Sequence, residues 1–186
     1  MRVDKLIAAT HGRDAARAYR SYVLQPHQRD RAGEIGQDVL RYFARVAGAC
    51  TGLSAVYATA LRGIASLPAY VVAGSLSADG ARVFGNDKPV DGKRDFADSN
   101  LSWDGHVWVM IGDYVADISI GWTARFGGPS ALTTTVAREF GPTAGLLIVK
   151  WRDAPLSGLV YSPQYVLSDE QVATLDSSAL AAFEKA

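Results

Sequence analysis

The sequence predicts an α+β domain in which helices pack against an antiparallel sheet. Three features predict this class: apolar residues at helical spacing in the first third of the chain, β-like runs joined by turns after residue 68, and a capped helical segment near the end. The 186 residues suffice for one domain with one core. We expect an N-terminal helical arm over 1–47, a core over 48–166 and a C-terminal helix over 168–185.

The helices are predicted from apolar spacing and from residues that begin or end helices. Helical spacing is present over 4–23, 30–47 and 53–63. In the second of these segments the apolar stripe consists of Ile35, Val39, Phe43 and Val46. Pro26 breaks the chain between the first two helices, and Gly63 is expected to end the third. The last helix should begin with Ser168 as its N-cap, because Gln171 follows three residues later and completes a capping box.

The strands are predicted from short apolar runs bounded by Gly, Pro and polar residues. They are expected over 69–76, 144–151 and 158–166, with a hairpin over 105–120. Gly112 and Asp113 fit the two-residue turn of that hairpin. The segment 77–104 is rich in Gly, Asp and Asn, and it predicts a long loop with a short strand at 81–84.

The composition narrows the class of protein. Apolar residues make up 48% and charged residues 20%, which is typical of a soluble globular chain. Basic and acidic residues number 19 each, and this zero net charge argues against non-specific binding to nucleic acid. No apolar run reaches the ~20 residues of a membrane helix, and the first residues lack a signal-peptide pattern. We therefore predict a cytoplasmic protein without a membrane anchor, although export by a dedicated machine would leave the same pattern.

The single cysteine, Cys50, is the first candidate for chemistry. It lies where the Gly-rich segment GACTG enters a helix, and it is flanked by Gly48 and Gly52. Unpaired N–H groups and the dipole at a helix N-terminus stabilise negative charge, so a thiolate is favoured there. The alternative is a small buried apolar residue, which is what most free cysteines are. A lone cysteine excludes an internal disulfide and a multi-cysteine zinc site, and we expect neither a metal nor a cofactor.

His106 and Asp117 supply the second and third candidates. If Gly112 and Asp113 form the turn, Asp117 is a diagonal cross-strand neighbour of His106 on the same face of the hairpin. An Asp inside the apolar run VADISI is costly unless it has a partner, and His106 is the available one. The hairpin thus predicts a general base together with the carboxylate that orients it.

Other titratable residues fit this role less well. Asp113 belongs to the turn, and Asp104 lies in the loop next to His106, where it could contact a substrate. His11 and His27 lie in or beside the N-terminal helices, and no carboxylate is spaced along the chain so that it would pair with either of them. Both are expected at the surface.

Aromatic residues near His106 are candidates for contacts with a substrate. Trp103 precedes His106 in the loop and could line a groove together with Asp104, or it could simply anchor the loop. Trp108 shares the face of His106 and could form the floor of the cleft, although a core position is the plainer interpretation.

Two segments resemble the transglutaminase-like superfamily. The run CTGLSAVYATALRGIASLPAYVVAGSL is similar to its nucleophile helix and the strand that follows. The matching residues are Cys50, Ser54, Arg62, Gly63, Pro68 and Gly74. The run GHVWVMIGDYVADISI is similar to its histidine hairpin, with His106, Trp108 and Asp117 in the family's order. The resemblance covers residues 48–120, and nothing comparable is found in the first 47 residues.

The resemblance implies a papain-like α+β core and a Cys-His-Asp triad acting on a protein or peptide. The superfamily includes protein cross-linking enzymes, peptidases, peptide-N-glycanases and inactive relatives. The hairpin here is shorter than in many transglutaminases and no acidic calcium cluster is evident, so a calcium-dependent cross-linking enzyme is not expected.

The leading expectation is a cysteine peptidase or amidase that forms an acyl-enzyme. A transglutaminase or glutamine deamidase is the first alternative, because only the group that resolves the acyl-enzyme differs. A small-molecule acyltransferase ranks lower, since the sequence has no Gly-rich phosphate-binding loop. The remaining alternative is a non-catalytic binding domain with the same fold. The sequence does not predict an oligomeric state.

Overall fold

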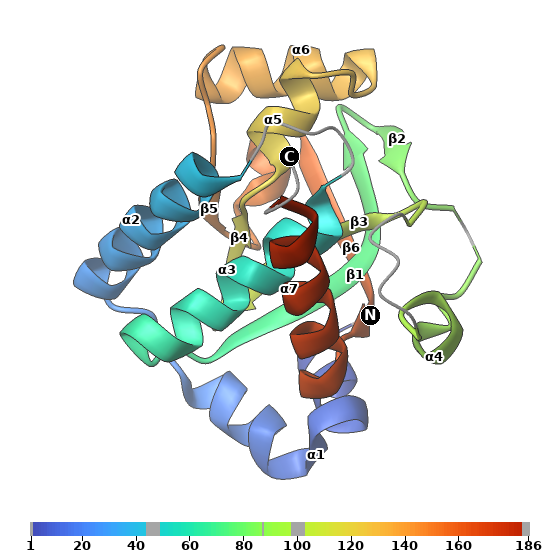
Figure 1. The fold of residues 1–186 in the computed structure, drawn as a ribbon. Coiled ribbons are helices and arrows are strands. Elements are labelled where there is room, and N and C mark those ends of the chain that lie inside the picture. Colours follow the sequence, from blue (N-terminus) through green and yellow to red (C-terminus); the bar gives the residue numbers. More distant parts are fainter. Residues whose placement is uncertain (1, 44–48, 87, 98–102, 184–186) are drawn as a thin grey trace.

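A computed structural model of the chain describes residues 2–43, 49–86, 88–97 and 103–183, and it has an α+β fold (Figure 1). The helices are α1 (Val3–Ser21), α2 (Pro26–Tyr42), α3 (Cys50–Ala65), α4 (Gly92–Asp95), α5 (Ile120–Arg125), α6 (Ser130–Phe140), a 3₁₀ turn η1 (Ala154–Ser157) and α7 (Asp169–Phe183). The strands are β1 (Ala69–Ala78), β2 (Ala81–Phe84), β3 (His106–Ile111), β4 (Tyr114–Asp117), β5 (Leu147–Lys150) and β6 (Leu159–Val166).

The strands form one curled antiparallel sheet with β1 at its centre. On one edge β1 pairs with β3 through its first half and with β2 through its last residues, and on the other edge it pairs with β6. From β3 the sheet continues through β4 to β5. The α+β class and the antiparallel sheet are therefore as the sequence predicts.

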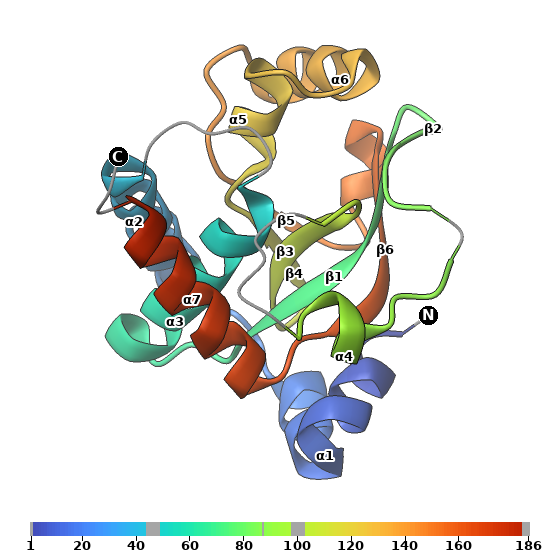
Figure 2. The same ribbon diagram turned by 45° about the vertical axis from the view of Figure 1, so that its right-hand side comes forward.

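Helices cover both faces of the sheet, and strand alternation divides the core between them. Val71, Val107 and Val109 face α2, α3 and α7. Val72 and Met110 belong to the second cluster, which includes residues of α1 and α6. Figure 2 shows α2, α3 and α7 together on one side of the sheet. Because both faces are buried, β1 and β3 are almost continuously apolar, as expected for strands covered on two sides.

The N-terminal helices, expected as a helical arm over 1–47, pack into this core. Ile7 of α1 is fully buried against the second face, and Ile35 of α2 is buried against the first. The side chains of Thr10 and His11 form hydrogen bonds of 3.0 and 2.9 Å with the carbonyl oxygens of Val166 and Leu167. His11 is therefore largely buried, and its expected surface position was wrong.

Locally encoded features agree with the sequence prediction. In the hairpin, Ile111 pairs with Tyr114 across the Gly112–Asp113 turn, and Gly112 has a positive φ of 56°. At the start of α7, the Ser168 N–H donates to Gln171 Oε1 at 2.9 Å and the Gln171 N–H donates to Ser168 Oγ at 3.2 Å. Those two bonds are the predicted capping box.

Several helix boundaries differ from the prediction, each for a physical reason. α2 begins at Pro26, since proline fits the first turn of a helix and Gln25 caps it together with Gln28. Gly63 lies inside α3, and the helix ends instead at Ala65, with Ser66 as its C-cap in a left-handed conformation. The chain between the hairpin and β5 forms α5 and α6, for which no element was predicted. Val46 lies outside the described residues.

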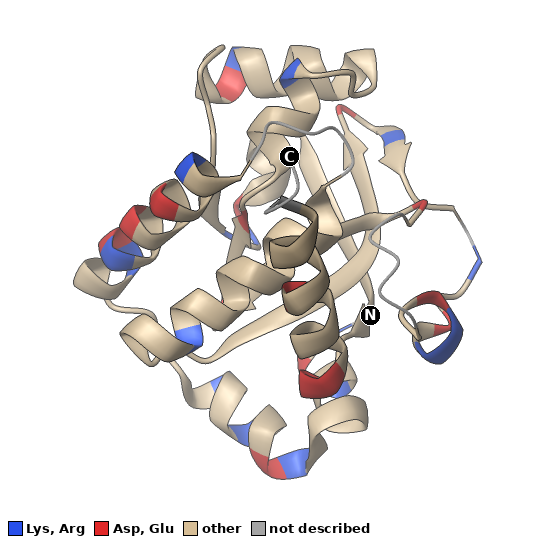
Figure 3. Ribbon diagram, in the orientation of Figure 1, with Lys and Arg blue, Asp and Glu red and all other residues tan. Residues whose placement is uncertain are grey.

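Charged side chains are concentrated on the helices, whereas the sheet carries few (Figure 3). α2, for example, has ion pairs of 2.8 Å three residues apart, between Arg31 and Glu34 and between Arg41 and Asp38. Asp117, in β4, is the buried exception. Among the described residues, no helix combines the length and hydropathy that crossing a membrane requires.

Candidate active site

Cys50 is the first residue of α3, and the first turn of that helix is attached to β3. The Leu53 N–H donates to Ala49 O at 2.9 Å and closes the turn, which leaves the earlier N–H groups without helical partners. The Ser54 hydroxyl donates to the carbonyl oxygen of Val107 at 3.0 Å. This bond brings the start of α3 to the residue next to His106.

His106 and Asp117 form the contact that the hairpin register predicts. Nε2 of His106 lies 2.5 Å from Oδ2 of Asp117. Because the Tyr161 hydroxyl also donates to this carboxylate oxygen, at 2.9 Å, the oxygen accepts and Nε2–H donates. With Nε2 occupied, Nδ1 is the ring nitrogen left for a second partner.

Asp117 is fully satisfied although none of its surface is exposed. Its second oxygen, Oδ1, accepts from the Ser119 N–H, the Ser119 hydroxyl and the Ile120 N–H, each at 3.1 Å. Together with His106 and Tyr161 these donors explain how an apolar strand accommodates a carboxylate. They also attach the start of α5 to the end of β4.

Aromatic rings enclose the imidazole. Phe84, from β2, stacks on His106 at 5.4 Å between ring centroids, while Trp108 and Tyr161 lie at 6.1 and 6.2 Å. His106 consequently retains only 1% of its surface. As the first residue of β3, it lies at the end of the strand, where the start of α3 on the other face of the sheet can reach it.

The pKa values of Cys50 and His106 shift in opposite directions. Burial raises the pKa of Cys50, but the hydrogen bond and charge of His106 and further bonds from Val107 and Thr51 outweigh it, so the pKa lies below its ordinary 9.0. Burial lowers the pKa of His106, but the charge and hydrogen bond of Asp117, followed by those of Cys50, raise it to about 10. Both shifts favour a thiolate beside an imidazolium at neutral pH.

The sulfur has little access to solvent in this conformation, because Cys50 is only 7% exposed. Gly52, one of the two glycines that flank Cys50, is buried within α3. Gly48, the other flanking glycine, lies outside the described residues.

Trp103 and Asp104 lie beside the three residues rather than among them. Both line a polar cavity of about 230 Å³ that also includes Gly105, the residue before His106. Trp103 packs on Phe96 with ring centroids 5.3 Å apart. Asp104 is exposed, and its carboxylate accepts from the Asn86 amide at 3.3 Å. Asp113 remains in the hairpin turn, as predicted.

Trp108 has the core position that was the plainer interpretation of the sequence, and its contact with a substrate stays a prediction. Its side chain is 1% exposed and packs edge-on against Tyr161 at 5.2 Å between ring centroids. Its Nε1–H has no hydrogen-bond partner among the described residues. Trp108 therefore supports the site through its ring, as a packing residue.

Phe84, Ser119 and Tyr161 were not identified from the sequence as parts of this site. Ser119 had a readable signal, since an Asp two residues before a Ser can accept from that residue's N–H in a local turn. Phe84 and Tyr161 had none, because β2 and β6 reach His106 and Asp117 only through the pairing of both strands with β1.

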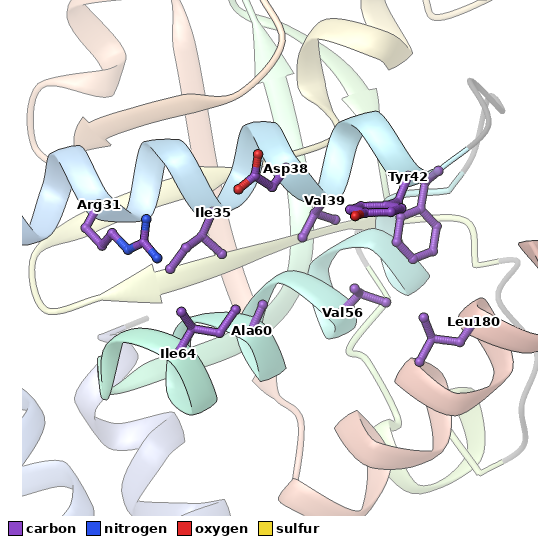
Figure 4. A pocket seen from close by; sticks show the side chains of 10 residues that line it. Arg31, Ile35, Asp38, Val39, Tyr42, Val56, Ala60, Ile64 and Leu180 are labelled. Atoms are coloured by element: carbon purple, nitrogen blue, oxygen red, sulfur yellow. The ribbon is translucent and has the colours of Figure 1, made fainter.

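An apolar groove of about 420 Å³ lies elsewhere, between α2, α3 and α7 (Figure 4). Tyr42, Ile64 and Leu180 are exposed large side chains that line it. Its charged residues, Arg31 and Asp38, are paired with neighbours on α2. The described residues that line the groove thus include no thiol and no acid–base pair, and the Cys50 cluster is the candidate active site.

Within the described ranges, no group of three or more His, Cys, Asp or Glu residues is arranged to hold a metal ion.

Comparison with known proteins identifies no relative: no family model matches the chain, and neither a curated protein nor a solved structure does.

Proposed function

We propose that this protein is a thiol-dependent enzyme that cleaves or transfers an amide or acyl group through Cys50, His106 and Asp117. The observation that carries the proposal is the buried pair in which the imidazole donates to a carboxylate at 2.5 Å, with the helix that begins at Cys50 bonded to the residue next to that imidazole. Nucleophile, base and orienting acid in this order are the requirement for acyl transfer by a thiol.

In the proposed mechanism the Cys50 thiolate attacks the carbonyl carbon of the substrate. Electrons of the C=O bond move to oxygen, and the Cys50 backbone N–H at the start of α3 is positioned to stabilise that charge. Collapse of this intermediate expels the amine, which takes a proton from His106, and leaves an acyl-enzyme. That proton came from the Cys50 thiol, and Asp117 holds the imidazole both while it takes the proton and while it passes it to the amine.

The resemblance to the transglutaminase-like superfamily supports a papain-like core and a protein or peptide substrate. The order of a nucleophile helix, a strand and a histidine hairpin is the family's order, and α3, β1 and the β3–β4 hairpin occur in that sequence. Hydrolysis of a peptide or isopeptide bond is our first choice. Glutamine cross-linking or deamidation is the second, and differs in whether an amine or water resolves the acyl-enzyme. A small-molecule acyltransferase remains a third choice.

One observation favours a different function, namely a binding domain without catalysis. Cys50 and His106 are 7% and 1% exposed, which is low for groups that must meet a substrate. A buried thiol packed only for its volume would be chemically inert.

Alkylation of the thiol separates the two functions. Cys50 is the only cysteine, so uptake of iodoacetamide measured by mass spectrometry reports on this residue alone. We expect the folded protein at pH 7 to react ~10-fold or more faster than an unstructured cysteine peptide, since each unit of pKa depression raises the thiolate fraction about tenfold.

The controls are His106→Ala, which should remove the enhanced rate, and Cys50→Ala, which should remove labelling. A folded wild-type protein that reacts only at alkaline pH would contradict the enzyme proposal and support the binding domain. Where the enhanced rate is found, incubation with a cell proteome should yield products or acyl adducts that depend on Cys50.

A further inference from the structure

We propose that Tyr161 is a positioning residue of the site: its hydroxyl takes part of the charge of Asp117 and so limits how firmly His106 holds its proton. The inference rests on the function proposed for Cys50 and His106. It concerns a residue on β6, which lies outside the segments that resemble a known family.

The geometry shows two donors competing for one carboxylate oxygen. Oδ2 of Asp117 accepts from the Tyr161 hydroxyl at 2.9 Å and from His106 Nε2 at 2.5 Å. Among the described residues, all the other donors to Asp117 bind Oδ1. Charge that Oδ2 shares with the phenol is withdrawn from the imidazole, because a hydrogen bond to a carboxylate lowers its affinity for another proton.

The packing around Tyr161 fixes its hydroxyl beside Asp117 as a hydrogen-bond donor. The residue is buried, its ring lies edge-on against Trp108, and its backbone pairs with Leu76 of β1. Burial, followed by the charge and hydrogen bond of Asp117, raises the pKa of Tyr161 well above its ordinary value. The phenol therefore stays protonated and acts as a donor throughout the accessible pH range.

Few groups other than Asp117 and Tyr161 lie close enough to His106 to change its proton affinity. The groups that face it are Cys50 from α3, Asp117 from β4, Tyr161 through that carboxylate, and the uncharged rings of Phe84 and Trp108. Catalysis needs a ring that first stabilises the thiolate and then releases its proton to the leaving group. An undivided Asp117 charge would help the first step and slow the second.

The test compares Tyr161→Phe with Tyr57→Phe in the full chain. Tyr57 is a matched control, since it is also a buried tyrosine whose hydroxyl makes one hydrogen bond, 2.9 Å to Ala32 O, away from the site. We expect Tyr161→Phe to move the acidic limb of the pH profile for Cys50 alkylation to lower pH by about half a unit or more. Tyr57→Phe should leave the profile unchanged. A purely structural role would lower the urea midpoint in both variants without moving the profile.

A second measurement is independent of catalysis. In a Cys50→Ala background, the pH titration of the His106 imidazole by NMR should have a higher midpoint with Tyr161→Phe than with tyrosine. An unchanged midpoint, or a shift to lower pH, would overturn the proposal for Tyr161. A wild-type thiol that reacts only at alkaline pH would instead overturn the enzyme proposal, and the NMR comparison would still decide the role of Tyr161.

Discussion

Asp117 and Asp79 are two carboxylates that each accept several hydrogen bonds, one inside the molecule and one at its surface. Asp117 has no exposed surface, and its donors come from β3, β6 and the start of α5. Asp79, in the turn between β1 and β2, accepts two bonds from Arg138 of α6 at 2.8 and 2.9 Å and one from Thr135 at 2.8 Å. Its side chain is 41% exposed.

The difference between the two sites lies in what replaces a lost bond. If Asp79 is removed, water can form hydrogen bonds with the guanidinium of Arg138. The surface ion pair is therefore only slightly more favourable than the solvated side chains. The donors around Asp117 are buried, so water cannot replace the hydrogen bonds that they would lose. Without Asp117, a His106 imidazolium would be a buried unpaired charge. The two carboxylates should therefore contribute very different amounts of stability.

The largest expected effect is that of Asp117→Ala. It should lower the free energy of unfolding by ~3–5 kcal/mol, because breaking a buried pair leaves its partner uncompensated. Urea unfolding followed by tryptophan fluorescence measures this difference. A loss below ~1 kcal/mol would mean that the inner carboxylate behaves like a surface one.

Asp117→Asn keeps the shape of the side chain and removes its charge. The imidazolium loses the charge that stabilises it, so the pKa of Cys50 should rise toward its ordinary value. We expect the rate of alkylation at pH 7 to fall about tenfold or more, in line with one unit of pKa. The matched variant is Asp79→Asn, which should leave this rate unchanged. An equal rate of alkylation in both variants would show that Asp117 does not contribute to the reactivity of the thiol.

A smaller effect is expected when the surface carboxylate is changed. Asp79→Asn should shift the urea midpoint less than Asp117→Ala does, because only an exposed ion pair is lost. The wild-type advantage over Asp79→Asn should shrink further in 1 M salt, where the screening length is about 3 Å. Persistence of the full difference at high salt would show that Asp79 acts through packing rather than charge.

The smallest effect is the dependence of this surface pair on pH. Hydrogen bonds from Arg138 and then Thr135 lower the pKa of Asp79 from 3.8 to about 2. A lowered folded-state pKa means that the contribution is complete above 3.8 and disappears as the pH falls toward 2. The stability difference between wild-type protein and Asp79→Asn should accordingly narrow over that interval. A constant difference from pH 6 to pH 2 would argue against a titrating Asp79.

Features that depend on neighbours in the chain could be predicted from the sequence. The Gly112–Asp113 turn sets the register of β3 against β4, and that register brings Asp117 to His106. The Ser168–Gln171 capping box likewise spans four residues. In both cases short-range geometry leaves one favourable arrangement, so local patterns determine the outcome.

Contacts between segments that are distant in the chain were decided by the tertiary structure. Tyr161 lies 44 residues from Asp117, and no spacing relates the two until β6 pairs with β1. The burial of Trp108 and the low exposure of Cys50 likewise depend on how several elements pack together. The sequence by itself indicated Cys50, His106 and Asp117 as candidates, because helix entry and strand register are local. Only the packing of the whole chain buries these three residues and brings the Tyr161 hydroxyl to Oδ2 of Asp117, since burial depends on atoms from many elements.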